Sequence, residues 1–346
     1  MIDFHRLIID WYRLNARSLP WRETKNPYYI WLSEVILQQT KVDQGLKYYL
    51  KFTNNYPRVL DLALASEEDV LNDWQGLGYY SRARNLHASA KMIMNDYGGV
   101  FPREYKDVIS LKGVGDYSAA AITSFAYGSP YAVLDGNVFR VLSRVFDIEL
   151  AIDSTEGKKM FKGLSQSLLP ENNSAEYNQA IMDFGAMQCK PKNPDCFSCV
   201  LQDNCLSFSK GIVGERPVKS KKAKTRNRYF NYLLLKNEGS LFLKKRISKD
   251  IWQHLYEFPM IETRKMLSID DLKSEIFSRY SCLPSEMKSL KKHVLSHQHI
   301  YANFIFFDTD YTGPIDSWVK VEVLDLQNYP LPRLIDRFLI EDGLRL

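Results

Sequence analysis

The chain has 346 residues, more than one compact core usually holds, so we expect two domains of roughly 100–200 residues each. Hydrophobic residues make up 45% of the chain and charged residues 25%, which excludes a disordered or fibrous protein. The net charge is +5, no apolar run reaches the ~18 residues that a membrane helix needs, and no cleavable signal pattern opens the chain. We therefore expect a cytoplasmic protein that does not bind membranes.

Up to about residue 205 the apolar residues recur at intervals of three and four, which predicts helices. The predicted helical stretches are 3–16, 28–54, 80–96, 104–110, 116–127, 137–147, 155–168 and 175–187. Ser66 begins a further helix as a capping residue, and Pro102 and Pro170 supply stops. No alternating run is long enough for a sheet, so this part of the chain is predicted to be all-α.

Four of the five cysteines fall within 17 residues, with the spacing C-x6-C-x2-C-x5-C; they are Cys189, Cys196, Cys199 and Cys205. In a reducing cytoplasm such a cluster indicates a metal site before a disulfide set. Structural zinc usually takes two separated CxxC-like pairs, whereas one short loop with a single CxxC suits an iron–sulfur cubane. Zinc and unligated thiols are the less favoured alternatives.

After the cysteines the segment 216–228 carries seven basic residues and no acid. These residues are Arg216, Lys219, Lys221, Lys222, Lys224, Arg226 and Arg228. A run of this kind is either a solvated linker or a tether that lies near phosphates.

Beyond this linker the period changes to two, which indicates strands. Tyr229–Lys236 and Ser240–Lys244 flank a turn that contains glycine and predict a hairpin. A helix over 269–279 capped by Ser268, a strand over His299–Asp308 and a closing helix over 332–341 complete a smaller α+β domain.

Two motifs in the helical part carry functional chemistry. In Leu111–Ala119 the residues Gly113 and Gly115 lie between two predicted helices. Their missing Cβ atoms let backbone N–H groups reach a phosphate, although glycines also simply close tight turns. As a hairpin between helices the motif favours contact with the DNA backbone.

The second motif is a pair of carboxylates. Glu34 lies in the apolar stretch IWLSEVILQQT, where burial would raise its pKa. Alternatively it occupies a polar face beside Ser33 and Gln38. Asp135 precedes a predicted helix, so it is either a catalytic carboxylate or an ordinary N-cap.

Together these features resemble the helix–hairpin–helix DNA glycosylases of the endonuclease III superfamily, and among them the MutY-type adenine DNA glycosylases. The resemblance runs from Trp11 to Cys205 and resumes more loosely after residue 229. It is carried by LPWR (19–22), SEVILQQT (33–40), WQGLGYYSRARNLH (74–87), LKGVGDYSAAAI (111–122), VLDGNVFRVLSR (133–144) and YNQAIMDFGAMQC (177–189).

The resemblance implies removal of adenine mispaired with 8-oxoguanine or guanine in double-stranded DNA, and a 4Fe–4S cluster on the four cysteines. It implies that Glu34 protonates the flipped adenine and that Asp135 stabilises the sugar cation, with Tyr117 and Asn137 as their partners. The residues that it places around the adenine or at the opened base pair are Arg22, Leu37, Gln39, Thr40, Leu77, Tyr80 and Gln179.

The chemistry of the reaction agrees with these roles. Cleavage of an N-glycosidic bond passes through a sugar cation, and it needs an acid on the base and a carboxylate near C1′. Relatives that also cut the strand carry a lysine where this chain has Tyr117, and a phenol cannot form the Schiff base which that reaction needs. Lys112, earlier in the turn, is expected to contact phosphate. We therefore expect a monofunctional glycosylase.

The C-terminal part resembles the Nudix-like domain with which such enzymes inspect 8-oxoguanine. Trp252, Leu255, Glu257, Phe258 and Pro259 fit its WxxxxEFP pattern, or are simply core. The string HVLSHQ (293–298) matches the recognition loop, with Ser296 and His297 as its polar residues. Leu295 stands where phenylalanine is usual, which weakens the case for base stacking there. A catalytic Nudix box is missing from 229–346, so pyrophosphate hydrolysis is excluded.

The predicted organisation is a helix–hairpin–helix domain (1–209) with its cluster loop (189–205), a basic linker (210–228) and a Nudix-like domain (229–346), in a monomer. Two rivals remain. One is a bifunctional pyrimidine-lesion glycosylase of the same superfamily, and the other is a non-catalytic iron–sulfur protein that binds DNA.

Overall fold

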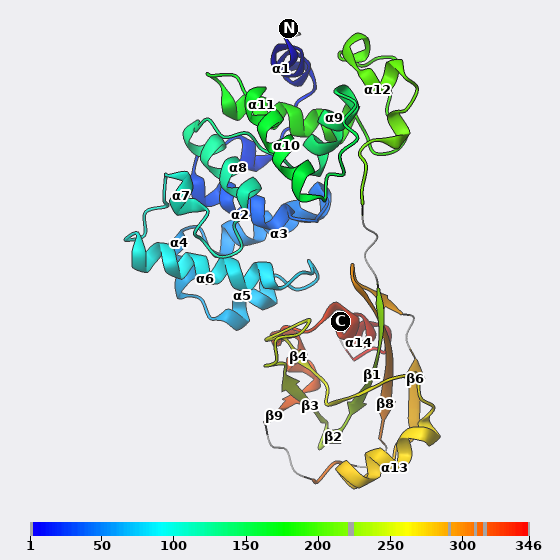
Figure 1. The fold of residues 1–346 in the computed structure, drawn as a ribbon. Coiled ribbons are helices and arrows are strands. Elements are labelled where there is room, and N and C mark those ends of the chain that lie inside the picture. Colours follow the sequence, from blue (N-terminus) through cyan, green and yellow to red (C-terminus); the bar gives the residue numbers. More distant parts are fainter. Residues whose placement is uncertain (1–2, 221–224, 290–291, 308–309, 314–316, 345–346) are drawn as a thin grey trace. The chain divides into compact units, whose positions relative to one another are not determined.

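The computed structural model describes residues 3–220, 225–289, 292–307, 310–313 and 317–344 (Figure 1). The chain forms two compact units. One comprises Met1–Leu64 and Asn85–Lys222, and the other comprises Ala65–Arg84 and Ala223–Leu346. The sequence alone places 65–84 in the helical domain, but the contacts of this segment group it with the C-terminal sheets.

The first unit is helical, and its described residues contain no strand. Its helices are α1 (Phe4–Asn15), α2 (Pro27–Leu37), α3 (Val42–Asn55), α4 (Val59–Leu64), α6 (Ser81–Asp96), which begins in the second unit, α7 (Tyr105–Val108), α8 (Asp116–Tyr127), α9 (Gly136–Val145), α10 (Thr155–Ser167), α11 (Ser174–Asp183) and α12 (Leu206–Ser209) (Figure 1). A buried cluster that includes Ile8, Val141, Phe161 and Phe184 forms its core.

Two predicted helices are interrupted at places that matter for the site. The stretch 28–54 breaks between α2 and α3, where Gln39 adopts a left-handed backbone with φ 54°. The stretch 175–187 changes after α11 into a π-helix over Phe184–Gln188. Apolar periodicity does not reveal such breaks, because the apolar residues continue through them. A π-helical turn inside a helix is often found at a functional site.

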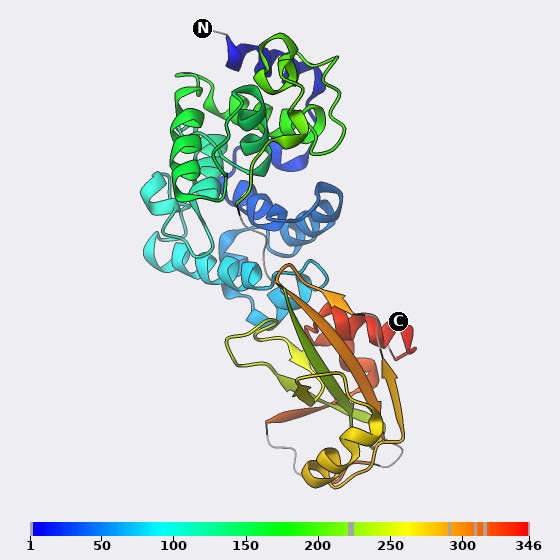
Figure 2. The same cartoon turned by 45° about the vertical axis from the view of Figure 1, so that its right-hand side comes forward.

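The second unit contains two sheets. In one, the strand order is β5 (Met260–Thr263), β1 (Arg226–Leu234), β8 (Gln298–Phe306) and β6 (Glu286–Ser289), and β7 (His293–Val294) also pairs with β8. In the other, β3 (Ser240–Lys245) pairs with β2 (Lys236–Asn237), β4 (Tyr256–Glu257) and β9 (Trp318–Glu322). Figure 2 shows β1 and β8 side by side; they are parallel, whereas the other pairs are antiparallel.

Helices flank these sheets. Phe338 of α14 (Arg333–Glu341) stacks on Phe304 of β8, with ring centroids 3.6 Å apart. Leu272 and Ile276 of α13 (Ile269–Tyr280) pack into a core with Ile305. Ser268 caps α13, as predicted, in a capping box with Asp271. The unit also contains α5 (Glu67–Asp73), whose N-cap Ser66 accepts from the N–H of Asp69 at 3.0 Å.

The predicted hairpin is partly wrong. A tight turn at Glu238-Gly239 joins β2 to β3, and both residues have positive φ (47° and 80°). The longer strand β1 does not pair with β3, because the chain changes sheets at Leu235. Alternation of apolar residues predicts a strand but not which sheet the strand joins. The predicted strand 299–308 corresponds to β8, and Asp308 lies outside the described residues.

The basic segment is not simply a solvated linker. Arg216 is buried and forms ion pairs with Asp147 and Glu149. Arg228 is buried between Glu262 and Asp250 in the second unit. These two cations are therefore neutralised within their own units and are unsuited to hold phosphate. Lys221, Lys222 and Lys224 lie outside the described residues.

Across the described part of the chain, no helix combines the length and the apolar character needed to cross a bilayer.

Candidate active site

A cleft of about 1010 Å³ opens in the first unit. Its walls come from α2, α8, α11, the first turns of α9 and the short turn Pro20–Arg22. Ten residues singled out from the sequence line it: Arg22, Glu34, Leu37, Gln39, Thr40, Gly115, Tyr117, Asp135, Asn137 and Gln179. Residues that are far apart in the sequence therefore meet around one space.

Glu34 is buried in the wall of this cleft, with 6% of its surface exposed. The alternative of a polar face on α2 is wrong, because neighbours on every side of the helix are buried and Ser33 donates inward to the carbonyl of Ile30 at 2.7 Å. Burial raises the pKa of Glu34 to about 7, with a further rise from Asp135. The Tyr117 hydroxyl opposes this rise by a hydrogen bond, and Arg22 opposes it by its charge. A carboxyl with this pKa can hold a proton near neutral pH.

Asp135 is both the N-cap of α9 and part of the cleft. Its Oδ1 accepts from the backbone N–H groups of Asn137 (2.9 Å) and Val138 (2.8 Å), and its Oδ2 accepts from the Asn137 side chain at 2.8 Å. Burial raises the pKa of Asp135, and these three donors oppose the rise. The donors favour the ionised form, so the two carboxylates of the cleft have contrasting surroundings.

Tyr117 stands at the start of α8 and contacts Glu34. Its hydroxyl carries one proton, and it lies 3.8 Å from the sulfur of Met182 as well as within hydrogen-bond reach of Glu34. A carboxylate is a better acceptor than a thioether, so the proton belongs on the side of Glu34. Burial raises the pKa of Tyr117 well above its usual value, which keeps the phenol neutral.

Two partly buried hydrogen bonds orient the side chains of Arg22 and Gln179, which also line the cleft. Arg22 donates to Asp183 at 2.7 Å, and the Asp183 side chain is fully buried. The hydroxyl of Tyr12 donates to the amide oxygen of Gln179 at 2.9 Å. Because its oxygen is engaged in this way, Gln179 has its NH₂ group left for a ligand.

Arg140 connects the first turn of α9 with the cysteine loop. Its guanidinium donates to the Asn137 side-chain oxygen (2.9 Å), the Gly185 carbonyl (2.6 Å) and the Cys189 carbonyl (2.8 Å). Gly185 lies in the π-helix, where an added Cβ would stand 2.7 Å from Cβ of Asn137. Asn137 is thus held from two sides.

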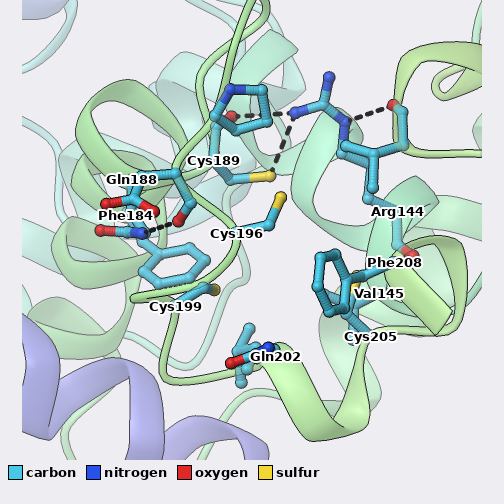
Figure 3. A pocket seen from close by; sticks show the side chains of 14 residues that line it. Arg144, Val145, Phe184, Gln188, Cys189, Cys196, Cys199, Gln202, Cys205 and Phe208 are labelled. Carbon is cyan, nitrogen blue, oxygen red and sulfur yellow. Dashed lines mark hydrogen bonds between the residues drawn. The ribbon is translucent and has the colours of Figure 1, made fainter. Parts of the chain in front are cut away.

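The four clustered cysteines line one cavity next to α9 (Figure 3). Arg144 of α9 lies beside Cys189, with Nη1 3.4 Å from its sulfur, and also donates to the Lys190 carbonyl at 2.7 Å. Figure 3 shows the labelled cysteines around a shared space, with Cys189 and Cys196 on the side of the Arg144 guanidinium, whereas the sulfur of Cys205 lies 3.4 Å from the Arg144 carbonyl. Within the described residues, no three His, Cys, Asp or Glu side chains stand close enough to hold a single metal ion.

The second unit has a separate pocket of about 300 Å³. It gathers four predicted residues, Leu77, Tyr80, Ser296 and His297. Tyr79, Arg84 and Trp252 also line it, and the backbones of Tyr79 and Trp252 are left-handed (φ 48° and 58°). The loop before α6 and the loop before β8 therefore belong to one site.

The glycines of the predicted hairpin differ. Gly113 has φ 79°, and a Cβ there would lie 2.9 Å from the side chain of Asn85, so glycine is required. Gly115 is the extended N-cap of α8, and a Cβ there would meet nothing within 4 Å. Neither Gly113 nor Lys112 lines the cleft.

Comparison with known proteins decides the family. Residues 32–168 match the HhH-GPD superfamily base excision DNA repair proteins, and residues 231–341 match the NUDIX domain. The chain is 34% identical over 307 residues to the adenine DNA glycosylase of Buchnera aphidicola subsp. Baizongia pistaciae, covering 88% of this chain and 85% of that one. It is 30% identical over 340 residues to the enzyme of the subspecies Schizaphis graminum, covering 97% of each. The chain belongs to the adenine DNA glycosylases. It is a hydrolase of base excision repair that acts on DNA.

Other known glycosylases match only part of this chain. A thymine/uracil-DNA glycosylase of Methanothermobacter thermautotrophicus is 31% identical over 208 residues, which is 60% of this chain and 94% of that one. The solved structure of a thermostable thymine-DNA glycosylase, also 31% identical, superposes with a TM-score of 0.56 over 60% of this chain and 95% of that one. A non-covalent endonuclease III–DNA complex, 23% identical, superposes with a TM-score of 0.52 and shares the fold.

Sequence reasoning missed several residues that line the glycosylase cleft or hold its lining residues in place. Asp183, Tyr12 and Arg140 contact the predicted residues but do not stand out in the sequence. Asp183 was an ordinary acid inside a predicted helix, and its partner Arg22 is 161 positions away. The available signal was the position of Asp183 as an acid among the apolar residues of the matched string YNQAIMDFGAMQC.

Proposed function

We propose that this glycosylase flips adenine out of duplex DNA and removes it where it is mispaired with 8-oxoguanine or guanine. The observation that carries this proposal is the pair Glu34 and Asp135, which come from separate elements, line one cleft and have contrasting surroundings. Two carboxylates whose environments separate their pKa values can divide the roles of acid and cation stabiliser.

In this mechanism Glu34 holds the proton that adenine needs in order to leave, because its pKa of about 7 keeps a large fraction protonated near neutral pH. Burial raises the pKa of Asp135, but its three N–H donors favour the carboxylate form, which is suited to face the positive charge that develops on the sugar. Asn137 keeps Asp135 oriented, and Tyr117 holds Glu34 in place. Gln179 and Arg22, with Leu37, surround the base.

The reaction is proposed to stop at base removal. Strand cleavage by β-elimination needs an amine beside C1′, and the buried phenol of Tyr117 occupies the position next to Glu34. Lys41 is the lysine among the described cleft residues. Tyr117→Lys should produce a protein–DNA adduct on borohydride reduction. An adduct of the unchanged protein that disappears with Lys41→Ala would contradict the monofunctional assignment.

The cysteine loop is proposed to hold a 4Fe–4S cluster on Cys189, Cys196, Cys199 and Cys205. The donor set fits in kind, because four thiols line one cavity and Arg144 supplies a cation beside them. When bound, such a cluster would supply a rigid cross-link of the loop. Anaerobic purification followed by metal analysis should find about four iron atoms per chain. One zinc and no iron would contradict the assignment.

The pocket of the second unit is proposed to read the base opposite adenine through Ser296 and His297. Leu77 and Tyr80, with Gln39 and Thr40 of the first unit, are proposed to contact the opened pair, and Gly113 and Gly115 the phosphate backbone.

Single-turnover excision from duplexes with one defined mispair tests the whole proposal. Adenine opposite 8-oxoguanine should react fastest and adenine opposite guanine next. Duplexes with thymine or uracil opposite guanine should remain intact. Faster release of the pyrimidine would favour the activity named for the Methanothermobacter relative.

A further inference from the structure

In the recognition loop of the second unit (293–298), a series of hydrogen bonds runs from Arg226 of strand β1 to the tip of the loop. The loop is a tight turn in which the Leu295 N–H donates to the Gln298 carbonyl at 2.8 Å, so Ser296 and His297 are its two central residues. Both central side chains are exposed, whereas Gln298 is fully buried. A buried amide behind an exposed tip can fix the direction of the hydrogen bonds that the tip residues make.

The direction of the chain of bonds follows from Arg226. Nε of Arg226 lies 3.1 Å from Oε1 of Gln298, and a guanidinium can only donate. This contact fixes which end of the amide is oxygen, so the NH₂ end is the one that lies 3.0 Å from Nε2 of His297. An NH₂ group also only donates, and Nε2 of His297 must therefore accept.

The ring of His297 then has a single arrangement. With Nε2 as acceptor, the neutral imidazole carries its proton on Nδ1, and Nδ1 lies 3.2 Å from Oγ of Ser296. The imidazole N–H occupies one lone pair of the hydroxyl. The hydrogen of Ser296 is then free to point away from the loop, into the pocket that Leu77 and Trp252 also line.

We infer that Arg226 and Gln298 are positioning residues that hold His297 in its Nδ1–H form, so that Ser296 presents a hydrogen-bond donor to the base in this pocket. The inference rests on the proposed reading of 8-oxoguanine by this unit. 8-Oxoguanine carries an oxygen at C8, where guanine has only a C–H, and its N7 bears a hydrogen. A hydroxyl with one free hydrogen and one free lone pair can donate to that oxygen and accept from N7–H. Guanine lacks the C8 oxygen, and its N7 is an acceptor, which would face the lone pair of a hydroxyl whose hydrogen is turned towards C8.

The substitution Gln298→Glu is expected to reverse the direction of the hydrogen bonds from Gln298 to Ser296, with almost no change in the shape of the side chain. A carboxylate can accept from Arg226 and can also accept from His297, which moves the imidazole proton to Nε2. Nδ1 then accepts from Ser296, and the hydroxyl hydrogen turns inward. Gln253→Glu is the matched control for charge, because it makes the same amide-to-acid change in the neighbouring loop at a residue that does not line the pocket.

The tautomer is measured directly in the full-length protein labelled with [15N]histidine. The chain has six histidines, and the signals of His297 are identified by their loss in His297→Asn. Two-bond ¹H–¹⁵N spectra should show the Nδ1–H form in the unchanged protein and in Gln253→Glu, and the Nε2–H form in Gln298→Glu. An Nε2–H or doubly protonated ring in the unchanged protein would overturn the inference, whatever its substrate preference.

The functional consequence is measured as the ratio of single-turnover excision opposite 8-oxoguanine to that opposite guanine. Gln298→Glu should lower this ratio about threefold to tenfold, which is the worth of one hydrogen bond, and Gln253→Glu should not. An equal ratio in both variants overturns the reading role even if the tautomer is as inferred.

Should Gln298→Glu fail to fold, Arg226→Leu at an exposed position should give mixed tautomers and an intermediate ratio, and an unchanged spectrum overturns the inference. A ratio of one in the unchanged protein refutes the proposed function itself, and the spectrum still decides the tautomer.

Discussion

The cleft of the first unit and the pocket of the second unit position their polar groups in opposite ways. In the cleft, Glu34 and Tyr117 are buried and Asp135 caps a helix, so regular structure and burial set their geometry. In the pocket, Ser296 and His297 are exposed at the tip of a turn, and a buried amide behind them contacts His297 and limits its orientation.

This difference matches the two tasks. Moving a proton to a leaving base needs a group whose pKa has been shifted, and burial is the means by which proteins shift the pKa of a carboxyl. Telling 8-oxoguanine from guanine needs few directed hydrogen bonds and no shifted pKa, so exposed side chains suffice. The cleft should therefore respond to substitution by large losses of rate, and the pocket by smaller changes of preference.

Glu34→Gln should give the largest effect. The amide keeps the shape of the side chain but cannot supply the proton, so single-turnover excision should fall by about 10³-fold with binding to the mispair retained. Glu23→Gln, the same change at an exposed site outside the cleft, is the control. Near-normal excision by Glu34→Gln would show that another group is the acid.

The same substitution should stabilise the fold at alkaline pH. The pKa of Glu34 is about 7 in the folded chain against an ordinary 4.5. Between these values the folded chain keeps a proton that the unfolded chain releases, so stability falls as pH rises through this window. The penalty above pH 7 is about 3 kcal/mol. Tm at pH 8 should rise by several degrees in Glu34→Gln, and at pH 4 the two proteins should melt alike.

Gly185→Ala tests how tightly the cleft is held. The new Cβ would lie 2.7 Å from Cβ and 3.0 Å from the backbone oxygen of Asn137, which positions Asp135. Displacement of this pair should slow excision by roughly 10- to 100-fold. Gly163→Ala, in α10 with nothing within 4 Å of the added atom, should leave the rate unchanged and slightly stabilise the helix. Equal rates for both variants would mean that Asn137 is not held through Gly185.

Ser296→Ala combined with His297→Ala should have a smaller and selective effect in the second unit. The preference for 8-oxoguanine over guanine opposite adenine should fall by about tenfold, with little change in excision from adenine–guanine pairs. Substitution within this unit is a cleaner test than truncation near Ser209, because truncation also removes Arg216, which is paired with Asp147. A parallel loss on both substrates would indicate a role in folding or in general DNA binding.

The sequence was sufficient for features that are local or that repeat with a period. The charge of Glu34 among apolar neighbours, the spacing of the cysteines and most helices of the first unit belong to this class. The short helices α4 and α12 and the breaks after α2 and α11 were not predicted. Contacts between distant segments were not predictable, as with Arg22 and Asp183 or the bonds of Gln75 in the 65–84 segment with Leu331 (3.1 Å) and Asp336 (3.0 Å). Packing decides these contacts, and neither periodicity nor composition records it.

Tyr117→Phe should produce the smallest effect, a shift of the pH profile. The excision rate should fall as pH rises through the pKa of Glu34, near 7, because only the protonated carboxyl donates. The hydrogen bond from Tyr117 stabilises the ionised form and so holds this pKa down. Without it the pKa rises, and the falling limb of the single-turnover profile should move to higher pH, with activity retained at pH 8 relative to the maximum.

Asp135 supplies the opposite control, since its charge raises the pKa of Glu34: in Asp135→Asn any residual excision should lose its alkaline activity at lower pH than in the unchanged protein. In the second unit, Ser296→Ala should leave the limb where it is, because that pocket acts on the preference for the opposite base and not on the proton. A limb that moved equally in Tyr117→Phe and Ser296→Ala would erase the distinction between the two regions.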